Sequence, residues 1–182
     1  MVLTFGDSVS QKYSGTLSYI TFIIFVLLTF SGVRSFAQGL PIFDNIKLEQ
    51  KTDFKSAEPY ALEAATYLLS TPYLKDDLDR LKSLQFVIKW MSGTPDYLFT
   101  VDDVAGKIIK GNEDELLGLY MAAMTKYSLE NKVSAGDVKL VKLNSIILLL
   151  NYCEDPANHI KMSKNLKKLS EAKAKGRLEQ EL

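Results

Sequence analysis

A long uncharged segment near the N-terminus sets the first limit on how this chain can fold. Between Lys12 and Arg34, the 21 residues Tyr13–Val33 carry no charge, and their middle part is strongly apolar. A helix needs about 20 such residues to cross a bilayer, so the segment is long enough to do so. A globular domain therefore has to form from the residues that follow it.

Two interpretations of this segment remain open. As a secretory signal peptide, it has Leu17–Phe30 as its apolar part, and the small residues of Ser35-Phe36-Ala37 suit cleavage after Ala37. As a retained membrane anchor, it spans residues 14–33, which the length of the run and the nearby Arg34 favour. Both interpretations predict an exported protein, periplasmic or secreted, and they predict contact with a membrane only if the segment is retained.

The residues after this segment are expected to form one domain. We assign residues 1–37 to the signal peptide or anchor, 38–55 to an extended lead-in and 56–182 to a single helical domain. The lead-in mixes glycine, proline, aspartate and asparagine with scattered apolar residues, so it lacks a helical repeat of apolar positions. The residues of the lead-in expected to pack on the domain are Ile42, Phe43, Ile46 and Leu48.

After Ser56 the pattern is helical almost throughout, and no strand pattern is present. Capping residues, glycines and prolines divide the chain into about six helices, which predicts an all-α fold, a compact bundle. The expected helices lie near Ala57–Leu69, Asp76–Met91, Thr100–Gly111 and Asn112–Asn131, then from Ser134 to the break at Asp155-Pro156, and after that break. A helical repeat is the alternative, but no matching residues recur at a fixed period.

The apolar positions predict which face of each helix is buried. The first helix is expected to bury Tyr60, Ala64, Tyr67 and Leu68. In the second helix, the residues expected to face inward are Leu78, Leu81, Leu84, Val87, Ile88 and Met91. The run Ile146–Leu150 is apolar all round, which is typical of a central buried helix.

Composition excludes several classes of function. The chain has 22 basic and 22 acidic residues, so its formal net charge is zero and it is not a globally basic nucleic-acid binder. Cys153 and His159 are the only cysteine and histidine, which excludes an intrachain disulfide and a zinc site built from several such residues. We expect Cys153 to be buried, and we predict no catalytic residues, no metal and no cofactor.

The first candidate for binding is an aromatic turn that follows the second helix. Trp90, Asp96, Tyr97 and Phe99 surround the turn-forming sequence Gly-Thr-Pro-Asp. Aromatic side chains on a rigid turn can contact a ligand or a protein partner. The same residues equally suit the core of a corner between two helices.

The second candidate for binding is the basic C-terminal segment. From Lys161 to Arg177 there are seven basic residues and one acidic residue. Lys164, Lys167 and Lys168 are the candidates for contact with anionic lipid, a polyanionic glycan or an acidic protein surface. A solvated terminal helix is the alternative, and nucleic acid is not expected because the segment lacks aromatic residues.

The layout of the chain resembles that of exported proteins of Bacteroidetes. An export signal that ends in Ser-Phe-Ala before Gln38 is followed by a small helical domain. The stretches Phe86–Phe99 and Leu119–Tyr127 are similar to segments of uncharacterised proteins from that group. This resemblance covers about half of the chain and implies no activity.

These observations predict an exported, non-enzymatic helical domain that acts by contact with a protein or an anionic surface. A membrane-anchored adaptor of the helical-repeat type remains an alternative, and so does an enzyme that acts on glycans with carboxylates alone. A binding module should expose an apolar patch of roughly several hundred Å². An enzyme should instead have a deep pocket lined by carboxylates with shifted pKa values.

Overall fold

Every regular element in the part of the chain that the structure describes is a helix. The structure, a computed structural model, describes residues 40–110 and 113–182. No strand is found in these two ranges, which confirms the predicted all-α fold. The predicted signal peptide or anchor and its cleavage site lie outside the described residues, as do Gly111 and Asn112, predicted to end one helix and cap the next.

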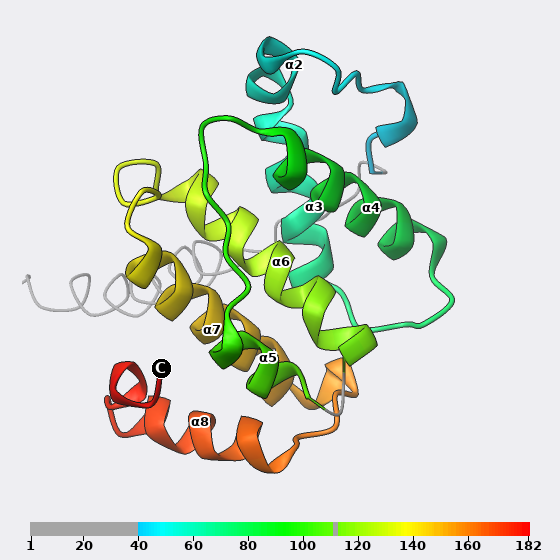
Figure 1. Cartoon of the computed structure of the whole chain (residues 1–182). Helices are drawn as coiled ribbons and strands as arrows, with labels where there is room; N and C mark the ends of the chain where they lie inside the picture. Colours follow the sequence, from blue (N-terminus) through cyan, green and yellow to red (C-terminus); the bar gives the residue numbers. More distant parts are fainter. Residues whose placement is uncertain (1–39, 111–112) are drawn as a thin grey trace, which may run out of the picture. The chain divides into compact units, whose positions relative to one another are not determined.

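Among the described residues, seven α-helices and three short 3-10 segments follow one another (Figure 1). The α-helices are α2 (Lys51–Ser56), α3 (Glu58–Ser70), α4 (Leu78–Gly93), α5 (Asp103–Ile109), α6 (Glu113–Glu130), α7 (Val138–Glu154) and α8 (Lys164–Ala174). The 3-10 segments are η1 (Phe43–Asn45), η2 (Pro156–Asn158) and η3 (Leu178–Glu181). The helices from α3 to α8 correspond to the six predicted ones. No helix among the described residues combines the length and apolar character needed to cross a membrane.

Carboxylate caps fix where several helices begin. Asp77 precedes α4 and Asp137 precedes α7, and each side chain accepts two backbone N–H groups of the first turn. The predicted cap of α5 at Thr100 was wrong. Asp102, two residues after Thr100, accepts the backbone N–H of Ala105 at 3.1 Å instead. The helix therefore begins at Asp103.

The lead-in over residues 38–55 is partly helical, because it contains η1 and most of α2. The prediction of an extended conformation was therefore wrong for these two segments. Phe43 stacks on Phe86 of α4 with the ring centroids 4.7 Å apart, and Leu48 is also buried. Ile42, in contrast, is exposed. The lead-in thus contributes side chains to the core of the domain.

Helix α6 lies at the centre of the packing (Figure 1). It packs against α3, α4, α5 and α7. Alanines occupy both sides of its contact with α3 and allow the two helices to approach closely: Ala61, Ala64 and Ala65 of α3 and Ala122 of α6. In a helical repeat each unit contacts only its neighbours in sequence. With α3–α4, α5–α6 and α7–α8 as the units, the additional contact between α3 and α7 joins the first unit to the third, which is the packing of a bundle.

The predicted buried face of α4 was only partly right. Val87 is buried, and Leu84 and Met91 are partly buried against the core, as expected. The side chains that α4 buries are Arg80, Ser83, Phe86, Val87 and Trp90. Leu78, Leu81 and Ile88, which were expected to face inward, are 69%, 50% and 40% exposed. Apolar residues surround most of α4, and the bulky Phe86 and Trp90 take the side that faces the lead-in, α2 and α3. Tyr60 of α3, also expected inward, is exposed as well.

Candidate interaction surface

The predicted aromatic turn between α4 and α5 is a structural corner. Trp90 is 0% exposed, and its indole N–H donates a hydrogen bond to the backbone oxygen of Phe54 at 2.9 Å. Tyr97 and Phe99 are half-buried, and their ring centroids lie 5.5 and 6.0 Å from that of Trp90. Because the indole has no free surface, Trp90 holds the turn onto α4 and cannot contact a partner in this conformation.

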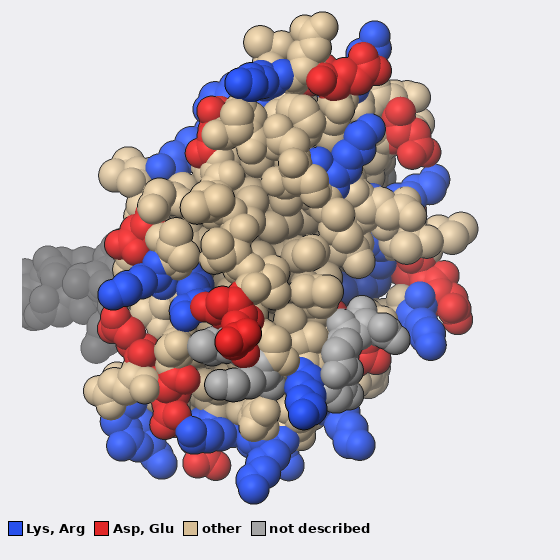
Figure 2. Space-filling view, viewed as in Figure 1, with Lys and Arg blue, Asp and Glu red and all other residues tan. Residues whose placement is uncertain are grey.

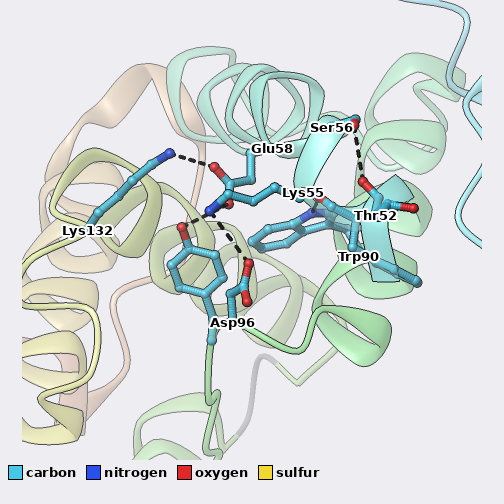
Figure 3. Close-up of polar contacts among 9 residues, drawn as sticks. Thr52, Lys55, Ser56, Glu58, Trp90, Asp96 and Lys132 are labelled. Atoms are coloured by element: carbon cyan, nitrogen blue, oxygen red, sulfur yellow. Dashed lines mark hydrogen bonds and ion pairs between the residues drawn. The ribbon is translucent and has the colours of Figure 1, made fainter. Parts of the chain in front are cut away.

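Beside this turn, Glu58 in the first turn of α3 is a buried carboxylate that the sequence did not single out (Figure 3). It accepts a hydrogen bond from the Tyr97 hydroxyl at 3.1 Å and pairs with Lys55 at 3.0 Å and Lys132 at 2.6 Å. Lys55 also lies 3.5 Å from Asp96, which is exposed. These contacts join the start of α3 to the segments that follow α4 and α6.

The charges around Glu58 determine its protonation. Burial raises the pKa of this carboxyl, but Lys132, Lys55 and the Tyr97 hydroxyl more than offset that effect and hold the pKa below its usual value of 4.5. Burial and the Glu58 charge together raise the pKa of Tyr97 to about 12. Glu58 is therefore an ionised, fully partnered carboxylate, which is typical of a structural ion-pair network.

Replacing Glu58 by glutamine is expected to lower the free energy of unfolding at pH 7 by about 1–2 kcal/mol. The loss is modest because both lysines are more than half exposed and regain water. Since the pKa of Glu58 is lowered in the folded state, its contribution is complete above pH 4.5 and declines as the pH falls through the folded pKa. Urea titrations of both proteins at pH 7 and at descending acidic pH values measure this. A difference in stability that stayed constant down to strong acid would contradict the ionised assignment.

The candidate lysines of the C-terminal segment lie on α8. Lys164, Lys167 and Lys168 are all exposed. Lys168 pairs with Glu181 of η3 at 2.6 Å, so an acid of the same domain neutralises part of the basic segment. Lys164 and Lys167 form no ion pair with a described residue. The accessible positive charge is therefore smaller than the sequence suggests.

Cys153 and His159 lie in different environments. Cys153 is buried, as expected, and burial raises the pKa of its thiol to about 12. His159 is exposed and has a left-handed backbone conformation with a φ of 55°. The thiol stays protonated near neutral pH and so is a poor nucleophile. In residues 40–110 and 113–182, no group of three or more His, Cys, Asp or Glu side chains is arranged to hold a metal ion.

The outer face of α4 carries a row of exposed apolar side chains, which we name the α4 ridge. It consists of Leu74, just before α4, and Leu78, Leu81 and Ile88 on the helix. Figure 2 shows one side of the molecule with mostly uncharged residues across its middle and with Lys, Arg, Asp and Glu gathered toward its edges. Several exposed apolar side chains along one helix are typical of binding sites, because monomeric proteins rarely leave large patches of apolar surface exposed.

A hollow of about 160 Å³ lies between α4 and α6, beside the α4 ridge. Leu81 and Leu84 of α4 line one side, and Gly118 lies on the α6 side. A Cβ atom at Gly118 would approach the Leu84 side chain to 2.8 Å, so glycine leaves this space open. Arg80 also lines the hollow, but its guanidinium is bonded to the end of α3. The space suits one bulky aliphatic side chain.

The sequence does indicate which side of α4 is exposed, but the periodicity of apolar residues alone does not show it. Phe86, Val87 and Trp90 form a second apolar face, and it is bulkier than the face of Leu78 and Leu81. Large aromatic residues favour the core, so this second face was the better choice for the buried side. No such signal exists for the cluster around Glu58, because two of its three partners, Tyr97 and Lys132, lie 39 and 74 residues further along the chain.

Comparison with known proteins identifies no relative of this chain. No protein-family model, curated protein or solved structure matches this chain, so inference about its function rests on the chain's own surface.

Proposed function

We propose that this domain is an exported, non-enzymatic module that binds another protein through the α4 ridge. The observation that carries the proposal is the exposure of Leu74, Leu78, Leu81 and Ile88, which ranges from 40% to 69%. Removing apolar surface from water contributes about 25 cal/mol per Å², so a partner that covered these side chains would gain affinity from them. The opposite face of α4 is packed on the core, which holds the ridge in place for such contact.

The carboxylates near the hollow and the turn support binding in preference to catalysis. Asp77 lines the hollow, but both of its backbone contacts cap α4. Glu58 is surrounded by two lysines and a tyrosine and has a lowered pKa. A glycan hydrolase needs an acid whose pKa is raised, whereas the pKa of Glu58 is lowered. The expected export places the contact outside the cytoplasm.

The proposal is tested on the full-length chain in its own cells by replacing Leu78 and Leu81 together with serine. We expect the wild-type protein to run on size exclusion as a complex larger than its own 20.4 kDa. The double variant should run at its own mass, because it lacks half of the ridge. Its free energy of unfolding should change by no more than about 0.5 kcal/mol per site, since both side chains are exposed.

The matched control is the pair Val138→Ser and Leu140→Ser on α7. These residues are 39% and 40% exposed and are also apolar, but they are not part of the α4 ridge. This control variant should remain in the complex. A complex that survives the double substitution on α4 would disprove the proposed function.

A further inference from the structure

The spacing along the α4 ridge indicates what shape of partner fits it. On α4, Leu78, Leu81 and Ile88 lie three and seven residues apart, and Leu81 and Ile88 are each followed by a lysine. Apolar side chains repeated every seven residues are the pattern by which one helix packs along another. The adjacent hollow beside Gly118 fits a side chain that projects from such a helix.

The charges at the edge of the ridge indicate the chemistry of the partner. Lys82 and Lys89 are exposed, and neither forms an ion pair with a described residue. Together with Gln85 and Asp44 they line a second, polar hollow, on the side of α4 away from Gly118. Among the described residues, neither lysine forms an ion pair with Asp44. The far side of the ridge, toward α6, carries Glu115. One long edge of the ridge is therefore positively charged and available for carboxylates.

Two other occupants fit this surface less well. In a second copy of the chain packed antiparallel across the ridge, the same edges of the two helices meet, so Lys82 and Lys89 would face their own counterparts. A bilayer surface would satisfy the lysines, but it offers no projecting side chain for the hollow beside Gly118. A helix from another protein satisfies both the positive edge and the hollow.

We infer that the partner presents an amphipathic helix, with apolar side chains on the α4 ridge and carboxylates facing Lys82 and Lys89. This inference rests on the proposed function and specifies the partner that it requires. When two helices pack along apolar side chains, the charged residues beside those side chains determine which helices pair. Lys82 and Lys89 would therefore favour a helix with acidic residues.

The inference is tested by photo-crosslinking from Gln85→p-benzoylphenylalanine in the full-length chain, made in its own cells. Gln85 is exposed and lies on α4 between Lys82 and Lys89. We expect a crosslinked peptide from a different protein, with apolar residues at helical spacing and acidic residues along one edge. Adding Lys82→Glu and Lys89→Glu should reduce the crosslinked product at least tenfold. The control pair Lys110→Glu and Lys139→Glu, exposed lysines just after α5 and on α7, should leave it unchanged.

Several outcomes would overturn the inference. These are an adduct between two copies of this chain, an adduct with lipid, a crosslinked peptide without acidic residues, no adduct at all, or a product insensitive to Lys82→Glu and Lys89→Glu. An adduct between two copies of this chain or with lipid would overturn the proposed function as well. In the other three cases, if the Leu78 and Leu81 serine variant still dissociates the complex, the proposed function stands and only the acidic helix is wrong. If that variant leaves the complex intact, the proposed function itself fails.

Discussion

Replacing Trp90 by alanine is expected to lower the free energy of unfolding by about 3–5 kcal/mol. The indole is fully buried, and it packs against Tyr97 and Phe99 of the following turn. Alanine would leave a cavity there, and the backbone oxygen of Phe54 would lose the indole N–H that it accepts at 2.9 Å. Since the residue joins α2, α4 and the turn, its loss should weaken the whole side of the domain that contains the lead-in. Urea denaturation followed by circular dichroism measures the change.

Trp90→Phe is the matched variant for this prediction. Phenylalanine keeps an aromatic ring in the core but donates no hydrogen bond, so the expected loss is about 1–2 kcal/mol. Trp90 is the only tryptophan, which makes the fluorescence of the wild-type protein an independent monitor of the same transition. A Trp90→Ala protein of nearly normal stability that had lost its binding partner would show instead that the indole is a contact residue.

The boundaries of the helices were predictable because the signals that set them are local. Asp77 and Asp137 cap helices through contacts within three residues, and Pro156 ends the run of α7. The short α2 was missed because its six residues are too few to show a periodic pattern. The cap of α5 was misplaced because Thr100 and Asp102 both offer acceptors, and only the path of the chain decides between them.

The rotation of α4 about its axis was not predictable from periodicity alone. Apolar residues occur on two of its sides, and the choice depends on distant partners such as Phe43 and Phe54. For the same reason Tyr97 and Phe99 of the predicted binding turn pack around Trp90, while Leu78, Leu81 and Ile88 of the α4 ridge were assigned to the core. The feature that distinguishes the two sides is the bulk of Phe86 and Trp90, since large aromatic side chains favour the core.

Arg80 is a buried guanidinium of α4 that bonds to the main chain of α3. Its terminal nitrogens donate to the backbone oxygens of Leu68 and Thr71 and to the Thr71 hydroxyl, at 2.8–3.1 Å. These acceptors lie at the C-terminal end of α3, where carbonyl groups lack partners and the helix dipole is negative. Tyr152 of α7 donates to the same Thr71 oxygen at 2.8 Å, and its ring centroid lies 6.0 Å from the guanidinium carbon. Arg80 thereby links α3, α4 and α7.

Replacing Arg80 by alanine is expected to lower the free energy of unfolding by about 3 kcal/mol, because the buried Leu68 oxygen loses its charged donor. Arg80→Lys keeps the charge, but one ammonium group cannot reproduce the fork that reaches both carbonyls, so about half of the loss should remain. Arg80→Met keeps the length and removes both the bonds and the cost of burying a charge, so its loss should be about 2 kcal/mol. Guanidinium denaturation of the three variants measures these differences, with the exposed Lys82→Met on the same helix as the control. An Arg80→Met protein as stable as the wild type would mean that the bonds to α3 only balance the desolvation of the guanidinium.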